Sequence, residues 1–215
     1  MASLINKLIA LIAILLLSPI LIISTLGILL SDFGPIIYKA KRAGKNGEIL
    51  KILKFRSMRI SKKEQSKITS KNDSRIFGFG NFMRLTKIDE LPQFFNILKG
   101  EMNIIGPRPE DISIVKDYYD ELMMESLCVN PGLASPGSLY NYTHVEDLLN
   151  EENAEEFYIK EILPLKVRMD VVYVRNRSLL YDLSIIMKTC MIIFNRSIGR
   201  KKFKLPKEYY LAKQI

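Results

Sequence analysis

Two adjacent acids, Asp89 and Glu90, are the residues whose types and spacing suggest chemistry most directly. A cationic stretch that contains Arg84 and Lys87 precedes them, and Arg108 follows between two prolines. Carboxylate oxygens bind Mg²⁺ beside a pyrophosphate, and a carboxylate can also attack phosphorus to form an acyl phosphate. Arginines offset phosphate charge through paired hydrogen bonds and favour an in-line transition state. Together these residues predict phosphoryl transfer.

A purely structural role for the same residues stays open. Thr86 and Asp89 match the capping-box pattern, so Asp89 would then only satisfy an N–H at the start of the helix that carries Pro92. Arg108 would be a surface arginine on a loop, and His144, the one histidine, a side chain without a function. Residues for several other mechanisms are missing, because the sequence has no Walker-type glycine loop, no GxSxG elbow and no HExxH motif.

The elements that position these residues predict an α+β fold that is predominantly helical. Extended segments at 35–38 and 48–55 flank a turn with two glycines, which predicts a hairpin, and residues 61–75 are expected to form a loop. Pro107 and Pro109 forbid a helix and hold Arg108 on a rigid loop. Helices are expected from 86–92 to Lys99, closed by Gly100, and over 110–125, 153–177 and 179–194.

The first thirty residues contain a candidate membrane segment, because no charged residue occurs from Leu8 to Leu30. As one helix these residues would span roughly 34 Å, close to the roughly 30 Å hydrocarbon thickness of a bilayer. Pro19, after Ser18, should kink this helix near its midpoint. Two halves would then enter and leave by the same face, or a bent helix would cross. A signal peptide is the alternative, since Lys7 precedes the apolar run, but no clear small-x-small cleavage site follows.

Charge is divided into three blocks along the chain. Residues 36–88 hold 15 Lys and Arg against 3 Asp and Glu, residues 89–171 hold 6 against 17, and residues 172–215 hold 10 against 2. Basic blocks beside a membrane segment favour anionic headgroups or phosphate-bearing substrates, and the cations that follow the segment favour a cytoplasmic domain. Nucleic acid is not expected as a partner, because the basic stretches lack an aromatic-rich platform and a helix-turn-helix.

The rest of the composition describes one globular domain. The 215 residues are 48% apolar and 26% charged, which excludes wholesale disorder and leaves no room for two catalytic domains. Two cysteines and one histidine cannot form a Cys/His zinc cluster, and a reducing compartment is the default. The apolar repeat over 179–194 is more typical of a core helix, although the basic residues 200–204 after it favour the membrane interface.

Five ordered motifs resemble the signature of the bacterial sugar transferases, the small monotopic phosphoglycosyl transferases that load a sugar phosphate onto polyprenyl phosphate. The likeness extends over most of the chain, to the stretch 170–182. It departs from the family's pattern at Ala40, where a glutamine is usual, and over 131–137, which replaces a PGxTGxxQ run. The motifs are Lys54–Met58, Asn72–Arg75, Ile88–Gln93, Asn96–Met102 and Ile105–Pro109.

The resemblance implies a mechanism. Asp89 would be the nucleophile that attacks the β-phosphorus of a nucleotide diphosphate sugar, such as a UDP-sugar, releasing UMP and leaving a phosphosugar on the enzyme. Polyprenyl phosphate would then take the phosphosugar, which begins the synthesis of a glycoconjugate. Asp89 and Glu90 would serve Mg²⁺, and Glu90 would assist as ligand or proton acceptor. Expected phosphate contacts and the loop that carries them are Arg84, Arg108, Lys54, Arg56, Pro107 and Pro109.

The resemblance also implies an organisation. A re-entrant helix broken at Ser18 and Pro19 would occupy residues 1–34, a cytoplasmic transferase domain with interfacial amphipathic helices residues 35–200, and a basic tail residues 201–215. The protein would lie on the bacterial inner membrane among membrane lipids, facing the cytoplasm, with a homodimer as one arrangement. Two other classes stay open: a glycosyltransferase that releases UDP, and a membrane adaptor without activity.

Overall fold

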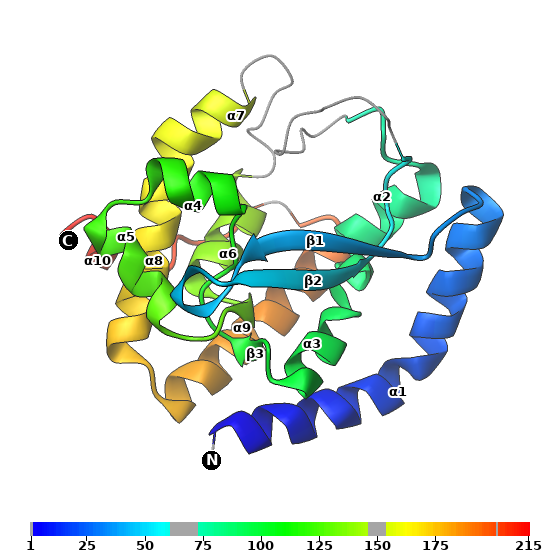
Figure 1. The fold of residues 1–215 in the computed structure, drawn as a ribbon, viewed down its shortest axis with the longest axis horizontal. Helices are drawn as coiled ribbons and strands as arrows, with labels where there is room; N and C mark the ends of the chain where they lie inside the picture. Colours follow the sequence, from blue (N-terminus) through cyan, green and yellow to red (C-terminus); the bar gives the residue numbers. More distant parts are fainter. Residues whose placement is uncertain (1, 61–72, 146–153, 201) are drawn as a thin grey trace.

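The computed structural model describes residues 2–60, 73–145, 154–200 and 202–215 of the chain (Figure 1). These residues form a mostly helical α+β body, as the sequence predicts, and contain two small two-stranded sheets. The helices are α1 (Ala2–Ser31), α2 (Gly78–Leu85), α3 (Gln93–Lys99), α4 (Ile112–Tyr118), α5 (Glu121–Met124), α6 (Pro136–Tyr140), α7 (Ala154–Phe157), α8 (Leu163–Asn176), α9 (Leu179–Ser197) and α10 (Lys207–Ala212). The strands are β1 (Ile37–Ala43), β2 (Ile49–Phe55), β3 (Asn103–Ile105) and β4 (Gly132–Ala134).

Helix α1 continues through Pro19 and is bent, running along one edge of the molecule before turning up a second edge (Figure 1). Proline removes a backbone N–H and leaves the carbonyl one turn earlier without its helical partner. The Ser18 hydroxyl donates to that carbonyl, the oxygen of Leu15, at 2.8 Å. This hydrogen bond makes a continuous, bent helix tolerable where no water can replace the lost bond.

Both arms of α1 pack against the rest of the molecule. Near its start, the Asn6 side chain accepts a hydrogen bond from the Ile104 N–H at 3.0 Å, and Ala10 lies in a core cluster with residues of β1, β2 and α3. Near its end, Ile28 is buried with Phe55 and the residues around α2. The outward side chains of the helix are exposed, and residues 4–31 are long and apolar enough to cross a membrane.

The predicted hairpin is confirmed as an antiparallel pair of β1 and β2, in register from Ile37 opposite Phe55 to Ala43 opposite Ile49. The turn between them places Asn46 and Gly47 at φ 54° and 79°. Strand β1 extends further than the predicted 35–38, since its cationic side chains face outward while Ala40 and Ala43 are buried.

Strands β3 and β4 form a parallel pair that the sequence patterns did not predict. Asn103 lies opposite Gly132, and Ile105 opposite Ala134. Glycine is required where these two segments approach each other, because a Cβ added to Gly132 would lie 2.0 Å from the Gly106 nitrogen. This close approach places the loop after β3, which carries Arg108, beside the loop after β4.

Three of the four predicted helices are confirmed and one is wrong. Helix α3 ends at Gly100, whose φ of 83° suits a left-handed cap. The described residues of 153–177 form α7, a π-helical turn and α8 in succession. In contrast, the predicted helix over 110–125 breaks at Tyr119, which is extended, because Asp120 accepts a hydrogen bond from the Met123 N–H at 2.7 Å and starts α5 as a separate helix.

Helix α9 confirms the predicted helix over 179–194, and it packs one side against the core while the other side is exposed. Ile185 is the one residue of the helix that is fully buried. Tyr181, Ile186 and Ile192 pack against its cluster and are half-buried, whereas a second set of large apolar side chains on this helix is exposed. They are Leu179, Leu180, Leu183, Met187, Met191 and Phe194, with Ile198 just beyond.

The predicted basic tail contains a packed helix. Residues 207–212 form α10, which contacts α8 and buries Ala212 beside Met169 and Val172. Glu208 is buried and accepts a hydrogen bond from the Tyr181 hydroxyl at 2.6 Å. The packed body therefore extends beyond residue 200.

Candidate active site

A tight turn presents the acid pair. Lys87 adopts the left-handed conformation at φ 57°, and Ile88–Glu90 follow as a single 3₁₀ turn that the Lys87 carbonyl closes by accepting the Glu90 N–H at 3.1 Å. The Thr86 hydroxyl donates backward to the Phe82 carbonyl at 2.8 Å, so it ends α2 and caps no helix after it. The capping-box alternative for Thr86 and Asp89 is therefore wrong.

Glu90 is held by two cations from separate elements. Arg108 Nη1 donates to Glu90 Oε2 at 3.1 Å while its Nη2 donates to Oε1, a two-bond fork, and Lys54 Nζ of β2 donates to Oε1 at 3.1 Å. Burial raises the pKa of Glu90, but the charges of Arg108 and Lys54 outweigh it and hold that pKa well below its usual range. Glu90 is therefore an ionised carboxylate that fixes both cations beside Asp89.

Asp89 lies in a different electrostatic environment from its neighbour. Burial, together with the charge of Glu90, raises the pKa of Asp89, although Lys54, Lys87 and Arg84 act in the opposite direction. Asp89 is 6% exposed, and its Oδ1 atom has no hydrogen-bond partner within the described part of the chain. Buried carboxylate oxygens normally have partners, so an oxygen without one has capacity for a ligand.

A second buried group without a partner lies on the next turn of the chain. The Gln93 side chain at the start of α3 is 1% exposed, and its Nε2 donor is unpartnered among the described residues. An acceptor on Asp89 and a donor on Gln93 thus remain unsatisfied four residues apart. Such pairs are costly in a folded protein unless a substrate completes them.

The loop that carries Arg108 is rigid and non-helical, as predicted. Pro107 and Pro109 are both buried, and the Pro107 carbonyl accepts a hydrogen bond from the Gly132 N–H at 3.0 Å. The Arg108 N–H donates to Asp170 on α8 at 3.1 Å. These contacts fix the backbone of Arg108 while its guanidinium reaches Glu90.

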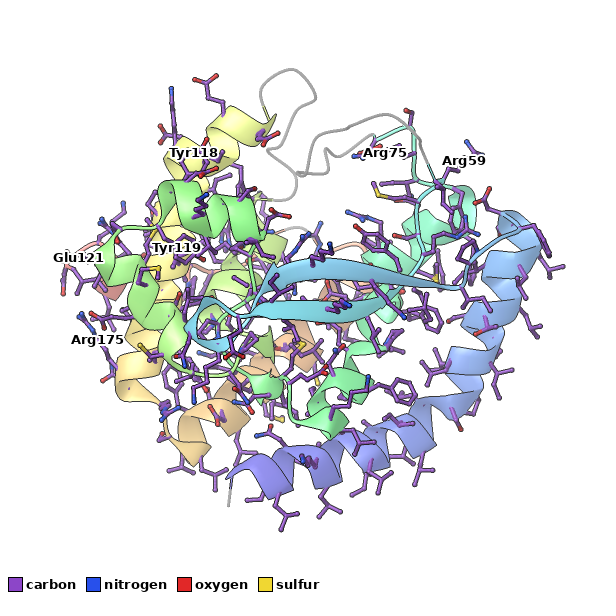
Figure 2. All side chains as sticks on the ribbon, viewed as in Figure 1. Arg59, Arg75, Tyr118, Tyr119, Glu121 and Arg175 are labelled. Carbon is purple, nitrogen blue, oxygen red and sulfur yellow. The ribbon has the colours of Figure 1, made fainter. Side chains whose placement is uncertain are left out.

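Two of the predicted phosphate contacts, Arg84 and Arg56, do not bind Glu90 as Arg108 and Lys54 do. Arg84 is in the last turn of α2 and lowers the pKa of Asp89 by its charge, but it is not part of the Glu90 fork. Arg56 is buried and donates to the Asp32 carboxylate and to the Pro35 carbonyl, which fastens the end of α1 to β2. Arg59 also approaches Asp32, and Figure 2 shows it on the side of the molecule that carries α1 and α2.

His144 packs within the fold and contacts two other segments of it. Its ring stacks on Tyr140 at a centroid distance of 5.5 Å, and Nε2 lies 3.2 Å from the Phe203 carbonyl oxygen.

Residues on α8 form a buried polar cluster that the sequence patterns did not single out. Lys166 Nζ donates to Glu110 and, at 2.6 Å, to the Tyr158 hydroxyl, which itself donates to Glu110 at 2.8 Å. Asp170 lies one turn further along the helix. The available signal was a cation, Lys166, four positions before an acid, Asp170, in a helix whose positions are mostly apolar.

A metal site built by the protein alone is absent from the described ranges, which contain no group of three or more His, Cys, Asp and Glu side chains that could hold an ion. The oxygen donors of Asp89 and Glu90 nevertheless suit Mg²⁺, which usually takes one or two carboxylates and completes its shell with water and substrate phosphates. Oδ1 of Asp89, which has no partner among the residues described, keeps its acceptor capacity for such an ion.

Comparisons with known proteins match most of this chain. A family model described as bacterial sugar transferase matches residues 1–196. The chain is 34% identical over 180 residues to the UDP-glucose:undecaprenyl-phosphate glucose-1-phosphate transferase of Escherichia coli (strain K12), covering 81% of this chain and 36% of that protein. It is 34% identical over 188 residues to a UDP-N-acetylgalactosamine-undecaprenyl-phosphate N-acetylgalactosaminephosphotransferase of Aeromonas hydrophila, covering 86% and 41%.

A shorter relative matches almost end to end. The exopolysaccharide production protein PSS of Rhizobium leguminosarum bv. phaseoli is 33% identical over 194 residues, which cover 87% of this chain and 92% of that protein. The chain thus spans well under half the length of the first two relatives and corresponds to nearly the whole of the third.

Proposed function

Because the chain belongs to the bacterial sugar transferase family, we propose that it transfers a sugar phosphate from a UDP-sugar to polyprenyl phosphate. The names of its relatives, which couple UDP-sugars to undecaprenyl phosphate, support these two substrates. The observation that carries the proposal is the buried, unpartnered oxygen of Asp89 beside the Glu90–Arg108 fork. The product would begin the assembly of a glycoconjugate on the membrane.

The proposed reaction has two displacements at one phosphorus atom. Asp89 Oδ1 attacks the β-phosphorus of the UDP-sugar, an O–P bond forms, and the bond from that phosphorus to the bridging oxygen breaks, so that UMP leaves. A phosphate oxygen of polyprenyl phosphate then attacks the same phosphorus, and the Asp89 carboxylate leaves unchanged. A buried carboxylate is poorly solvated, which makes its oxygen a better nucleophile than one in water.

The neighbouring cations stabilise the charge that develops on the phosphoryl oxygens. Arg108 and Lys54 lie beside Asp89 because Glu90 holds them there, and their positions are set before substrate binds. Arg84 adds positive charge from the end of α2. Arg56 is left out of this group because its guanidinium binds Asp32 and the Pro35 carbonyl.

Asp89 and Glu90 are the residues that would hold Mg²⁺. Their oxygens suit that ion, and Glu90 has one lone-pair position not used by Arg108 or Lys54 if a carboxylate accepts about four bonds. The bound ion would neutralise phosphate charge and polarise the bond that breaks.

We also propose that α1 enters and leaves the membrane by its cytoplasmic face. Asn6 and Ala10 near the start of the helix, and Ile28 near its end, all contact the same body. A helix that crossed the bilayer would place its two ends on opposite sides of the hydrocarbon core, roughly 30 Å apart. Its two arms could then not both contact a body that lies on one side. The exposed apolar face of α9 suits the same interface.

The nucleotide product tests the proposed function. The full-length protein in nanodiscs is supplied with UDP-glucose or UDP-N-acetylgalactosamine and polyprenyl phosphate, and nucleotides are separated by chromatography. The proposal expects UMP. Release of UDP would instead identify a glycosyltransferase that moves the sugar without its phosphate, and no release with any UDP-sugar across a donor panel would leave the membrane adaptor.

A further inference from the structure

One carboxylate joins two loops that are far apart in the sequence. Asp170 on α8 is 2% exposed, and its two oxygens accept backbone N–H groups from different segments. Oδ2 accepts the Arg108 N–H at 3.1 Å, and Oδ1 accepts the Gly137 N–H at 2.8 Å. The first loop carries the fork to Glu90, and the second lies within the stretch that departs from the family's pattern.

The second loop is built for this approach. A Cβ on Gly137 would lie 2.8 Å from Asp170 Oδ1 and 2.4 Å from the Lys166 carbonyl oxygen, so only glycine fits. The nearby Ser135 hydroxyl also lowers the pKa of Asp170, because it favours the charged form of the carboxyl. Ser135 and Ser138 bond each other reciprocally, at 3.0 and 2.8 Å, which sets the start of α6 and the direction of the Gly137 N–H.

A second contact ties the first loop to the same helix. Lys166, one turn before Asp170, pairs with the buried Glu110, two residues after Arg108. Helix α8 thus holds the loop on both sides of Pro109. Because Arg108 reaches Glu90 through a two-bond fork, a shift of its backbone would move the guanidinium away from the acid pair.

We propose that Asp170 is a positioning residue, which fixes the Arg108 loop against the 135–137 loop and so keeps the Arg108 guanidinium on Glu90 beside Asp89. This inference rests on the proposed function for its effect on turnover. Its geometric content, that one carboxylate orders both loops, is independent of the reaction.

The energetics distinguish positioning from a role in folding. Burial raises the pKa of Asp170 to about 6, even though the Gly137 and Arg108 N–H groups favour the charged form. The folded pKa lies above the ordinary value of 3.8, so the ionised carboxylate costs the fold stability at neutral pH. The titratable groups that face Asp170 are Lys166, Tyr119, Tyr158, Tyr173 and Tyr181, and the pKa of each of these four tyrosines is raised, so they stay neutral.

The test compares the full-length wild type with Asp170→Asn, and uses Asp117→Asn on the exposed surface of α4 as the matched control. Asn keeps one acceptor but turns an N–H donor toward one of the two backbone donors. We expect kcat for UMP release to fall about 100-fold with little change in KM, as for a small misplacement of a charge-stabilising group. The melting temperature should stay near that of the wild type, and Asp117→Asn should match the wild type throughout.

The pH profile supplies a readout that a merely structural residue would not move. Below pH 6 the wild-type Asp170 protonates and loses acceptor capacity, so the ratio of wild-type to Asp170→Asn kcat should shrink as pH falls through about 6. The ratio cancels the titration of Asp89, which both proteins share. A ratio that is constant from pH 5 to 8 would overturn the inference.

Amide hydrogen exchange separates this inference from the proposed function. In Asp170→Asn the peptides with the Arg108 and Gly137 amides should exchange faster, while α3 is unchanged. Wild type alone gives the same test, since protection of both amides should fall as pH drops from 7 to 5. Unchanged protection would contradict the inference, whereas a wild type that releases no UMP but shows these changes would refute only the proposed function.

Discussion

The surface of α1 and α9 and the interior around Asp89 distribute polarity in opposite ways. On the helices, apolar side chains face outward, with Leu30 89% and Leu180 81% exposed. In the interior, ionisable side chains are enclosed, with Lys166 4% and Asp170 2% exposed. Each arrangement is unfavourable for a protein in water and becomes favourable with the right surroundings.

The difference shows what each region requires. Exposed apolar stripes are stabilised by contact with lipid acyl chains, and buried charges by opposite charges and hydrogen bonds. Glu90 and Glu110 have such partners, whereas Asp89 has an oxygen without one. Under the proposed function the membrane would complete the first region and a phosphate-bearing substrate the second, as in an enzyme that brings a soluble donor to a lipid acceptor.

The largest effect is expected at the acid without a partner. Asp89→Asn removes the nucleophile and should lower UMP release by at least about 10³-fold. Because burial raises the pKa of Asp89, its charge opposes folding at neutral pH, and the neutral amide should melt at the same or a higher temperature. UMP release is measured alongside Asp117→Asn. A variant that melts normally and retains near-full UMP release would defeat the assignment.

A smaller effect is expected where a buried charge has its partner. Arg108→Lys keeps the positive charge but loses the two-bond fork to Glu90, so kcat for UMP release should fall about 10²-fold. The exposed Arg175, which pairs with Glu125 on the opposite side of the molecule from Arg59 (Figure 2), offers a matched Arg→Lys control. Equal turnover of both variants would show that the fork has no part in the reaction.

The outward face of α9 is tested with the two exposed cysteines of the chain. Cys190 lies on α9 among the apolar residues, and Cys128 ends the 3₁₀ turn that follows α5. Each is labelled with a fluorophore after the other is changed to Ser, and the protein is placed in vesicles with nitroxide lipids. Quenching should be several-fold stronger at Cys190, since an interfacial helix sinks its apolar face about 5–10 Å into the headgroup boundary. Equal quenching would place α9 off the membrane.

The bend in α1 should keep both ends of this helix on the cytoplasmic side of the membrane. In a Cys128→Ser, Cys190→Ser background, a cysteine introduced by Ser3→Cys should stay unreactive toward an impermeant thiol reagent in intact cells and react once the membrane is opened. Pro19→Leu restores the N–H to the Leu15 carbonyl and should straighten the helix. Labelling of the Ser3→Cys protein from outside, with Pro19 intact, would show a true span.

The sequence predicts elements well where a local rule decides them. The hairpin, the cap at Gly100 and the Ser18 hydrogen bond follow from turn residues, a positive φ and a missing N–H. The break at Tyr119 could not be predicted from apolar spacing, because it depends on which of several acids caps a helix.

The residues of the candidate site also fall into those that a local pattern predicts and those that it does not. The acid pair and Arg108 are visible as motifs, but the roles of Arg56 and Asp170 depend on contacts across 24 and 62 residues of sequence. The parallel pairing of β3 with β4, which brings the two loops to Asp170, rests on a close approach of two glycines that has no local signal. Long-range packing therefore decides which charged residues serve the site and which fasten the fold.

Incubation of the wild-type protein with a UDP-sugar alone, followed by intact-mass and peptide analysis, tests the central claim most directly. The account predicts a mass increase of one phosphosugar on the peptide that contains Asp89, its absence in Asp89→Asn, and its loss when polyprenyl phosphate is added. A wild-type protein that stays unmodified with donor alone, yet turns over in a sequential pattern once both substrates are present, would contradict it.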